Sequence, residues 1–167
     1  EFIDYAKKNP GKLNYGSGGV GSMGQLNVEM LKVSTGVFTT HIPYRGGTPL
    51  ITGVLANEVQ FILDNLVIML PHIQAGKVRA LAVAADQRLP QLPDVPTLAE
   101  VGYPELNLTS WTGLAAPAGT PEAVVQTLYK AVRQVATSPA MIANLKDRGV
   151  IPPEEMAPAA FEKMMAD

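Results

Sequence analysis

The stretch Lys12-Leu-Asn-Tyr-Gly-Ser-Gly-Gly-Val-Gly-Ser22 contains a short strand candidate followed by a glycine-rich loop. The strand is expected at Lys12–Tyr15 and the loop at Gly16–Gly21. Ser22 is a typical N-cap residue, and apolar side chains recur at helical spacing across the next segment, Met23–Thr35. A strand that passes through a glycine-rich loop into a helix is typical of an α/β fold.

Further strand and helix candidates alternate on the carboxyl side of this unit. Each expected strand is an apolar run, and glycine, proline or polar residues separate the runs. The strands are expected at Phe38–Tyr44, Val59–Leu63 and Lys77–Ala85, and the helices between them begin near Thr48–Pro49 and at Val67. This alternation predicts the α/β class, with a parallel sheet and right-handed crossovers.

The last third of the chain has a different pattern. One strand candidate, Leu106–Ala115, carries the single tryptophan, Trp111, and three helices are expected at Glu122–Thr137, Ser138–Arg148 and Ala159–Ala166. Three helices with one strand do not close a domain, so we expect them to cover a sheet formed elsewhere. Both ends of the chain fall within helical patterns, and we therefore interpret the sequence as an internal piece of a longer protein.

Composition excludes several classes of protein. A net charge of −2 gives no electrostatic basis for binding nucleic acid or an anionic membrane surface. The absence of cysteine excludes disulfides, thiolate metal sites and cysteine nucleophiles. No apolar run reaches the roughly 18 residues that span a bilayer.

The glycine-rich loop is the first candidate site. Glycines let backbone amides face a ligand, and the following helix presents unpaired N–H groups and the positive end of its dipole, which together favour a carboxylate or phosphate. Ser17 and Ser22 add hydroxyl groups. The alternative is a tight turn with a serine cap. The candidate residues are Gly16, Ser17, Gly18, Gly19, Gly21 and Ser22.

The second candidate lies at the ends of the next two strands. Arg45 is suited to bidentate binding of a carboxylate, and Tyr44 adds a hydroxyl beside Gly46. Asp64 could accept a hydrogen bond from a ligand hydroxyl or amine; the alternatives are an exposed turn arginine and a helix cap. Because parallel strands place their carboxyl ends at one edge, we expect these residues to face the same ligand.

The glycine-rich loop Gly16–Gly21 also satisfies G-x-G-x-x-G, the dinucleotide fingerprint, at Gly16, Gly18 and Gly21. The second strand ends at Tyr44–Arg45 and not in an acid, so NAD is disfavoured, and the NADP-binding domain of an oxidoreductase remains as the alternative. His41 and His72 have no partner at metal-ligand spacing and are expected to be structural. We therefore expect no catalytic residues, no metal and no cofactor.

Six stretches in order resemble one family, the substrate-binding proteins of tripartite tricarboxylate transporters, also called Bug-type proteins. The stretches are Tyr5-Ala-Lys-Lys-Asn-Pro-Gly-Lys-Leu13, Gly16-Ser-Gly-Gly-Val-Gly-Ser22, Pro43-Tyr-Arg-Gly46, Ala75-Gly-Lys-Val-Arg-Ala-Leu-Ala-Val83, Leu92-Pro-Asp-Val-Pro-Thr-Leu-Ala-Glu100 and Ala116-Pro-Ala-Gly-Thr-Pro121.

The resemblance implies a two-lobed periplasmic-binding-protein fold that closes on its ligand. Residues 1–106 would form the ligand-binding lobe, which is the family's second lobe, and residues 107–167 an incomplete part of the other. The implied ligand is a small organic acid, namely a di- or tricarboxylate, an amino acid or an aromatic acid, and the implied partners are membrane transporter subunits. The implied location is the periplasm.

Two departures from the family pattern stand out. Gln25 occupies a position where many relatives have histidine, so local packing or specificity is expected to differ. The first-lobe carboxylate loop would precede Glu1, so we expect the isolated chain to bind weakly or not at all. The further expectations are that it is unstable, or that it pairs with another copy to cover exposed sheet edges and apolar surface.

Overall fold

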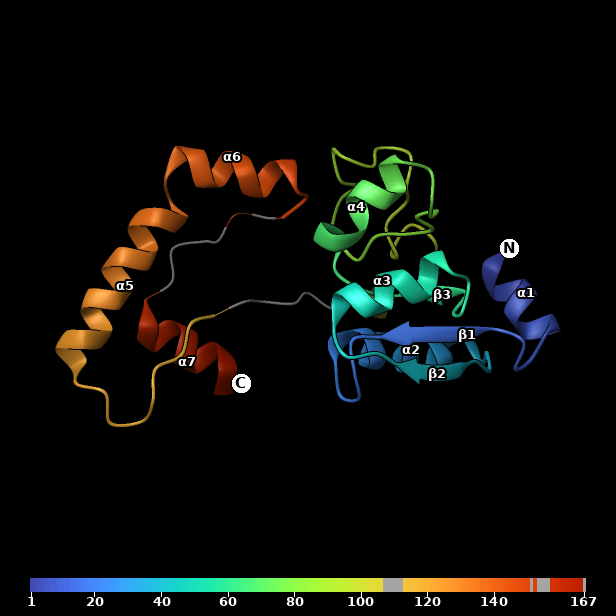
Figure 1. The fold of residues 1–167 in the computed structure, drawn as a ribbon, viewed down its shortest axis with the longest axis horizontal. Helices are drawn as coiled ribbons and strands as arrows, with labels where there is room; N and C mark the ends of the chain where they lie inside the picture. The colour runs from blue at the N-terminus through green and yellow to red at the C-terminus, as the bar shows by residue number, and fades with distance from the viewer. Residues whose placement is uncertain (107–112, 151, 153–156, 167) are drawn as a thin grey trace. The chain divides into compact units, whose positions relative to one another are not determined.

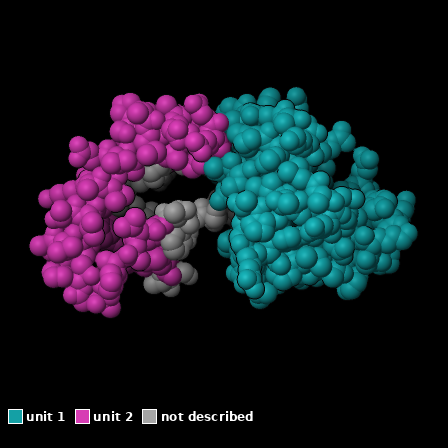
Figure 2. Space-filling model, in the orientation of Figure 1, with its two compact units in different colours: residues 1–110 teal, residues 111–167 magenta. Residues whose placement is uncertain are grey.

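The computed structural model describes residues 1–106, 113–150, 152 and 157–166. The chain forms two compact units, residues 1–110 and 111–167 (Figure 2). The first unit contains α1 (Phe2–Lys8), β1 (Asn14–Ser17), α2 (Met23–Thr35), β2 (Thr40–Pro43), α3 (Gly47–Leu55), β3 (Phe61–Ile62), α4 (Leu66–Gln74) and the 3₁₀-helix Pro104–Leu106 (Figure 1). The second contains α5 (Glu122–Ala136), α6 (Pro139–Asp147) and α7 (Pro158–Ala166).

The sheet of the first unit has three parallel strands in the order β2-β1-β3. Successive residues of β1 face opposite sides of the sheet. Tyr15 faces α2, where its hydroxyl donates to Glu29 at 2.6 Å. Gly16 faces α3, because a Cβ added there would lie 2.4 Å from Cδ1 of Leu50. The sheet is therefore covered by α2 on one face and α3 on the other, which confirms the predicted α/β class with a parallel sheet.

The predicted strand at Lys77–Ala85 is absent. The only pairing in that segment is an isolated parallel bridge between Val83 and Thr97. The apolar run serves packing instead of a sheet ladder. Ala82 and Ala84 pack against a cluster containing Leu98, whereas Val83 is buried in another cluster with Leu70 of α4 and Leu92. The predicted strand at Leu106–Ala115 falls mostly outside the described residues, and so does Trp111; residues 113–115 form no strand.

Among the described residues, the buried apolar clusters lie within residues 1–106. One contains Ala6, Leu13 and Val37, one Leu31, Leu98 and Leu106, and one Leu70, Val83 and Leu92. In the second unit, α5 and α6 contain no buried residue. Within the part of the chain that the structure describes, no helix combines the length and the apolar character that a membrane crossing requires.

Candidate functional site

Three loops meet at the carboxyl edge of the sheet, each following one strand. The loop after β1 contacts the loop after β2, where the Gly46 N–H donates to the Gly18 carbonyl at 3.2 Å. The loop after β3 approaches the start of α2, since a Cβ added to Gly24 would lie 3.7 Å from Oδ2 of Asp64. Gly18, Gly46 and Asp64 are thus brought to one edge, where ligands of open α/β sheets bind.

The first loop takes its shape from two glycines with positive φ and from the cap of α2. Gly19 has φ 141° and Gly21 has φ 78°, conformations that other residues rarely adopt. Ser22 is the N-cap residue, and its Oγ accepts from the Gln25 N–H at 3.4 Å. The predicted cap and helix, Ser22 and Met23–Thr35, are therefore confirmed.

Two helix N-termini start at this edge. α2 leaves the N–H groups of Met23 and Gly24 without an intrahelical acceptor, and α3 does the same with Gly47 and Thr48. None of these four amides has a hydrogen-bond acceptor among the described residues. Both helix dipoles place their positive ends here. An anion at this edge would therefore meet converging donors in a favourable field.

Gly16, Ser17 and Tyr44 lie beneath the edge. Gly16 makes room for α3, and Ser17 is fully buried. The Ser17 Oγ donates to the Gly19 carbonyl at 2.9 Å, and it lies 2.7 Å from Nε2 of His41. The Tyr44 hydroxyl donates to Oε2 of Glu58 at 3.0 Å, and burial together with this hydrogen bond raises the Tyr44 pKa. Both hydroxyls are thus engaged by other groups of the protein.

Arg45 and Asp64 are the charged residues of the predicted site, and both are exposed. Arg45 forms no ion pair with any described residue. Oδ1 of Asp64 accepts from the N–H of its neighbour Asn65 at 2.7 Å, which leaves the second carboxylate oxygen without a described donor. One cation and one anion therefore border the amide donors.

The sequence interpretation did not find the role of Gln25. Its Oε1 accepts from the Gly21 N–H at 2.6 Å, and its Nε2 lies 3.3 Å from Nδ1 of His41. Ser22-x-x-Gln25 matches the capping-box pattern, which predicts that the glutamine side chain folds back onto the Ser22 N–H; here it binds the preceding N–H, that of Gly21, so the pattern signals the fold-back but not this partner. Among the described residues, no cluster of histidine, aspartate or glutamate has the arrangement of a metal site.

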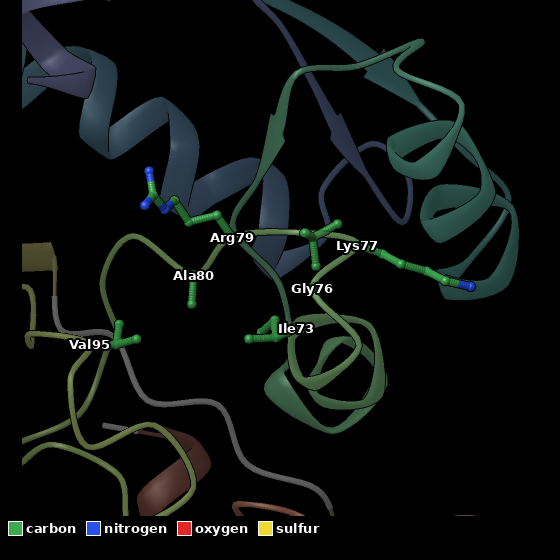
Figure 3. A pocket seen from close by; sticks show the side chains of 7 residues that line it. Ile73, Gly76, Lys77, Arg79, Ala80 and Val95 are labelled. Atoms are coloured by element: carbon green, nitrogen blue, oxygen red, sulfur yellow. The ribbon is translucent and has the colours of Figure 1, made fainter.

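The hollow beside the end of α4 is separate from this edge. It is a shallow, open depression of about 530 Å³, lined by Ile73, Gly76, Lys77, Val78, Arg79, Ala80 and Val95 (Figure 3). Ile73 and Ala80 point toward the hollow, whereas the Lys77 and Arg79 side chains extend away from it. Neither of the two charged lining residues therefore turns its side chain into the hollow.

The whole chain, residues 1–167, matches the model of the family described as "Tripartite tricarboxylate transporter family receptor". It is also similar to three solved structures. One is a periplasmic transporter, with 39% identity and a TM-score of 0.93 over 99% of this chain and 55% of that one.

The other two structures contain ligands. A protein from R. palustris, solved with adipate, is 34% identical with a TM-score of 0.92, and the match covers 99% of this chain and 55% of that one. MatC from Rhodopseudomonas palustris, solved with bound malate, is 33% identical with a TM-score of 0.91 over 99% of this chain and 57% of that one.

The chain spans about half the length of the curated relatives it matches, 47% and 45% for the first two. The family match and the three structures support the predicted family and fold, and they give the NADP-binding alternative no support.

Proposed function

This chain belongs to the tripartite tricarboxylate transporter receptor family, and from that premise we propose that it is part of a periplasmic solute-binding protein that captures a small organic carboxylate for membrane transporter subunits. The observation that carries the proposal is the meeting of two helix N-termini, with four unpaired amides, at one edge of a parallel sheet. Adipate and malate in two similar proteins support a di- or tricarboxylate as the ligand; an amino acid or aromatic acid is the broader alternative.

In this proposal the loop Gly18–Ser22 and the turn at Arg45–Gly46 hold a carboxylate. The helix amides donate to it, the Ser22 hydroxyl lies beside them, and the Arg45 guanidinium supplies the countercharge. Asp64 would accept from a ligand hydroxyl or amine and would repel a second carboxylate placed close to it. Gly16, Ser17 and Tyr44 act from beneath, by shaping the strand ends.

We further propose that the chain is not an enzyme. The Ser17–His41 pair has the spacing of a nucleophile and base, 2.7 Å, but Ser17 is fully buried. Its hydroxyl proton points to the Gly19 carbonyl and not to the imidazole. A hydroxyl that is sealed from solvent and donates its hydrogen bond to a carbonyl instead of a base lacks the exposure and activation of a nucleophile.

The test is an NMR titration of the chain with adipate and malate, followed at the backbone amides. We expect the largest saturable shifts at Met23, Gly24, Gly47 and Thr48, and the neutral diamide of adipic acid should leave them unchanged. Gly18→Val should weaken the shifts, because its Cβ would lie 3.9 Å from the Gly46 Cα and its two methyl groups would extend beyond that contact, between the two loops of the proposed site. The control Ala75→Val adds a branched side chain at an exposed residue with negative φ at the end of α4, outside the proposed site.

Equal shifts with the diamide, or shifts that centre away from these amides, would contradict the proposal. A shift with NADP alone would favour a dinucleotide site. For Asp64→Asn, we expect tighter binding of adipate and weaker binding of malate, whose hydroxyl would lose an acceptor; the same change in both affinities would argue against the role assigned to Asp64.

A further inference from the structure

The glycine-rich loop is held in shape by a continuous chain of side-chain hydrogen bonds. The Gly21 N–H donates to Oε1 of Gln25 at 2.6 Å, and the Gln25 Nε2 lies 3.3 Å from Nδ1 of His41. On the other side of the ring, Nε2 of His41 lies 2.7 Å from the Ser17 Oγ. That oxygen accepts from the Gly19 N–H at 3.2 Å and donates to the Gly19 carbonyl at 2.9 Å.

The chemistry of the donors sets the direction of every bond in this chain. A backbone N–H can only donate, so the Gly21 contact fixes oxygen as the Gln25 atom facing the loop and leaves the amide nitrogen facing His41. An amide nitrogen also only donates, so Nδ1 of His41 must accept and Nε2 must carry the proton. The imidazole Nε2–H then donates to the Ser17 Oγ, and the Ser17 hydroxyl donates in turn to the Gly19 carbonyl.

We infer that Gln25 and His41 are positioning residues for the proposed carboxylate site: together they hold the loop between Gly18 and Ser22 in the shape that leaves the first amides of α2 open. This inference rests on the proposed function for its ligand but not for its geometry. Gln25 ties the end of the loop to β2, and His41 ties β2 to Ser17 at the end of β1.

Protonation of His41 breaks this series of hydrogen bonds at the contact with Gln25. Adding a proton to Nδ1 places an N–H opposite the Gln25 Nε2–H, so two donors face each other. The groups around the ring are known from each element that contacts it. Tyr15 of β1 stacks on the imidazole at 4.8 Å, while Glu29 of α2 favours the charged ring and Lys32 of α2 opposes it. The positioning role therefore requires a neutral His41.

The test uses three variants of the chain and needs a ligand for only one readout. Gln25→Met keeps side-chain length but removes both hydrogen bonds, and His41→Phe keeps the ring that stacks on Tyr15. Gln74→Met, at the exposed end of α4, is the matched control. The readouts are the imidazole nitrogen shifts of His41 with His72 as internal reference, hydrogen exchange at Gly19 and Gly21, and adipate affinity by NMR titration.

For the unaltered chain we expect the Nε2–H tautomer at His41. Gln25→Met should increase exchange at Gly21 and also at Gly19, which Gln25 does not touch, and should weaken adipate binding about tenfold. His41→Phe should do the same at Gly19. Binding to the unaltered chain should weaken as His41 becomes protonated, whereas Gln74→Met should change none of these readouts.

A mixed or Nδ1–H tautomer, or an effect of Gln25→Met confined to Gly21, would overturn the positioning chain whether or not any acid binds. An altered Gly19 with unchanged adipate affinity would overturn the positioning role. Failure of the unaltered chain to bind adipate contradicts only the proposed function, because the tautomer and exchange readouts are taken without ligand.

Discussion

Two glycines of one loop differ in what their backbone requires. Gly21 has φ 78°, which penalises any side chain, although no atom lies within 4 Å of an added Cβ. Gly18 has no such φ, and an added Cβ would make an ordinary contact at 3.9 Å with Gly46. We therefore expect Gly21→Ala to lower the free energy of unfolding by about 1–2 kcal/mol, and Gly18→Ala to change it little. Chemical denaturation measures both, and equal losses would contradict this account.

His41 links stability to pH. Burial is the main cause of its lowered pKa; Glu29 opposes the shift, and Lys32 adds to it. Between the ordinary value of 6.5 and the lower folded-state value, the unfolded chain binds more protons than the folded one. Stability should therefore be highest above pH 6.5 and decrease as pH falls from there through the folded-state pKa. Denaturation at several pH values should show this slope, and His41→Phe should remove it; a slope unchanged in His41→Phe would assign the effect to other groups.

The sequence predicts the backbone of the site better than the contacts of its side chains. The need for glycine in the loop and the Ser22 cap follow from local rules, so both could be predicted. The alternation of β1 buries the Ser17 side chain on the α2 face, and Tyr44 fills the space above Gly53, so their hydroxyls engage His41 and Glu58. Those contacts join residues 14 to 24 positions apart, which no local pattern reveals.

The packing of α3 on the sheet depends on a glycine in the middle of the helix. A Cβ added to Gly53 would lie 2.2 Å from the Tyr44 hydroxyl oxygen, so the tyrosine would have to move and lose Glu58. We expect Gly53→Ala to destabilise the chain by about 1–3 kcal/mol, although alanine is the better helix former. The control is Gly47→Ala in the same helix, where the nearest atom is the flexible tip of Ile68 at 3.1 Å. A stabilised Gly53→Ala variant, seen by thermal unfolding, would contradict the close packing.

Helices were easier to predict from the sequence than strands. The expected helix at Met23–Thr35 matches α2, because a cap, a 3.6-residue apolar period and a terminal glycine agree. The run at Lys77–Ala85 was mistaken for a buried strand because a continuous apolar run has no period that separates a sheet ladder from other buried packing. Only the tertiary contacts of Val83 with Leu70 and Leu92 distinguish them.

The two units differ in how much apolar surface they bury. In the first, Tyr15, Leu50, Val28 and Val59 are almost fully buried, whereas the apolar stripe of α5 is 42–55% exposed at Val124, Leu128, Val132 and Val135. The backbone amides of the two units should therefore differ in their protection from hydrogen exchange. We expect slow amide exchange in β1 and α2 and fast exchange throughout α5 and α6; uniform protection would contradict this difference.

The exposed stripe of α5 also predicts how the isolated chain behaves at high concentration. Together with α6 it borders an apolar groove of about 430 Å³ lined by Ala131, Val132, Val135, Ala136, Met141 and Leu145. Exposed apolar faces of this kind promote association, because pairing removes them from water. We expect sedimentation to quicken with concentration, and Val132→Lys to suppress this. Gln134→Lys adds the same charge at an exposed position outside the groove, so it should leave the association intact. If both variants suppress it equally, net charge and not the apolar face controls self-association.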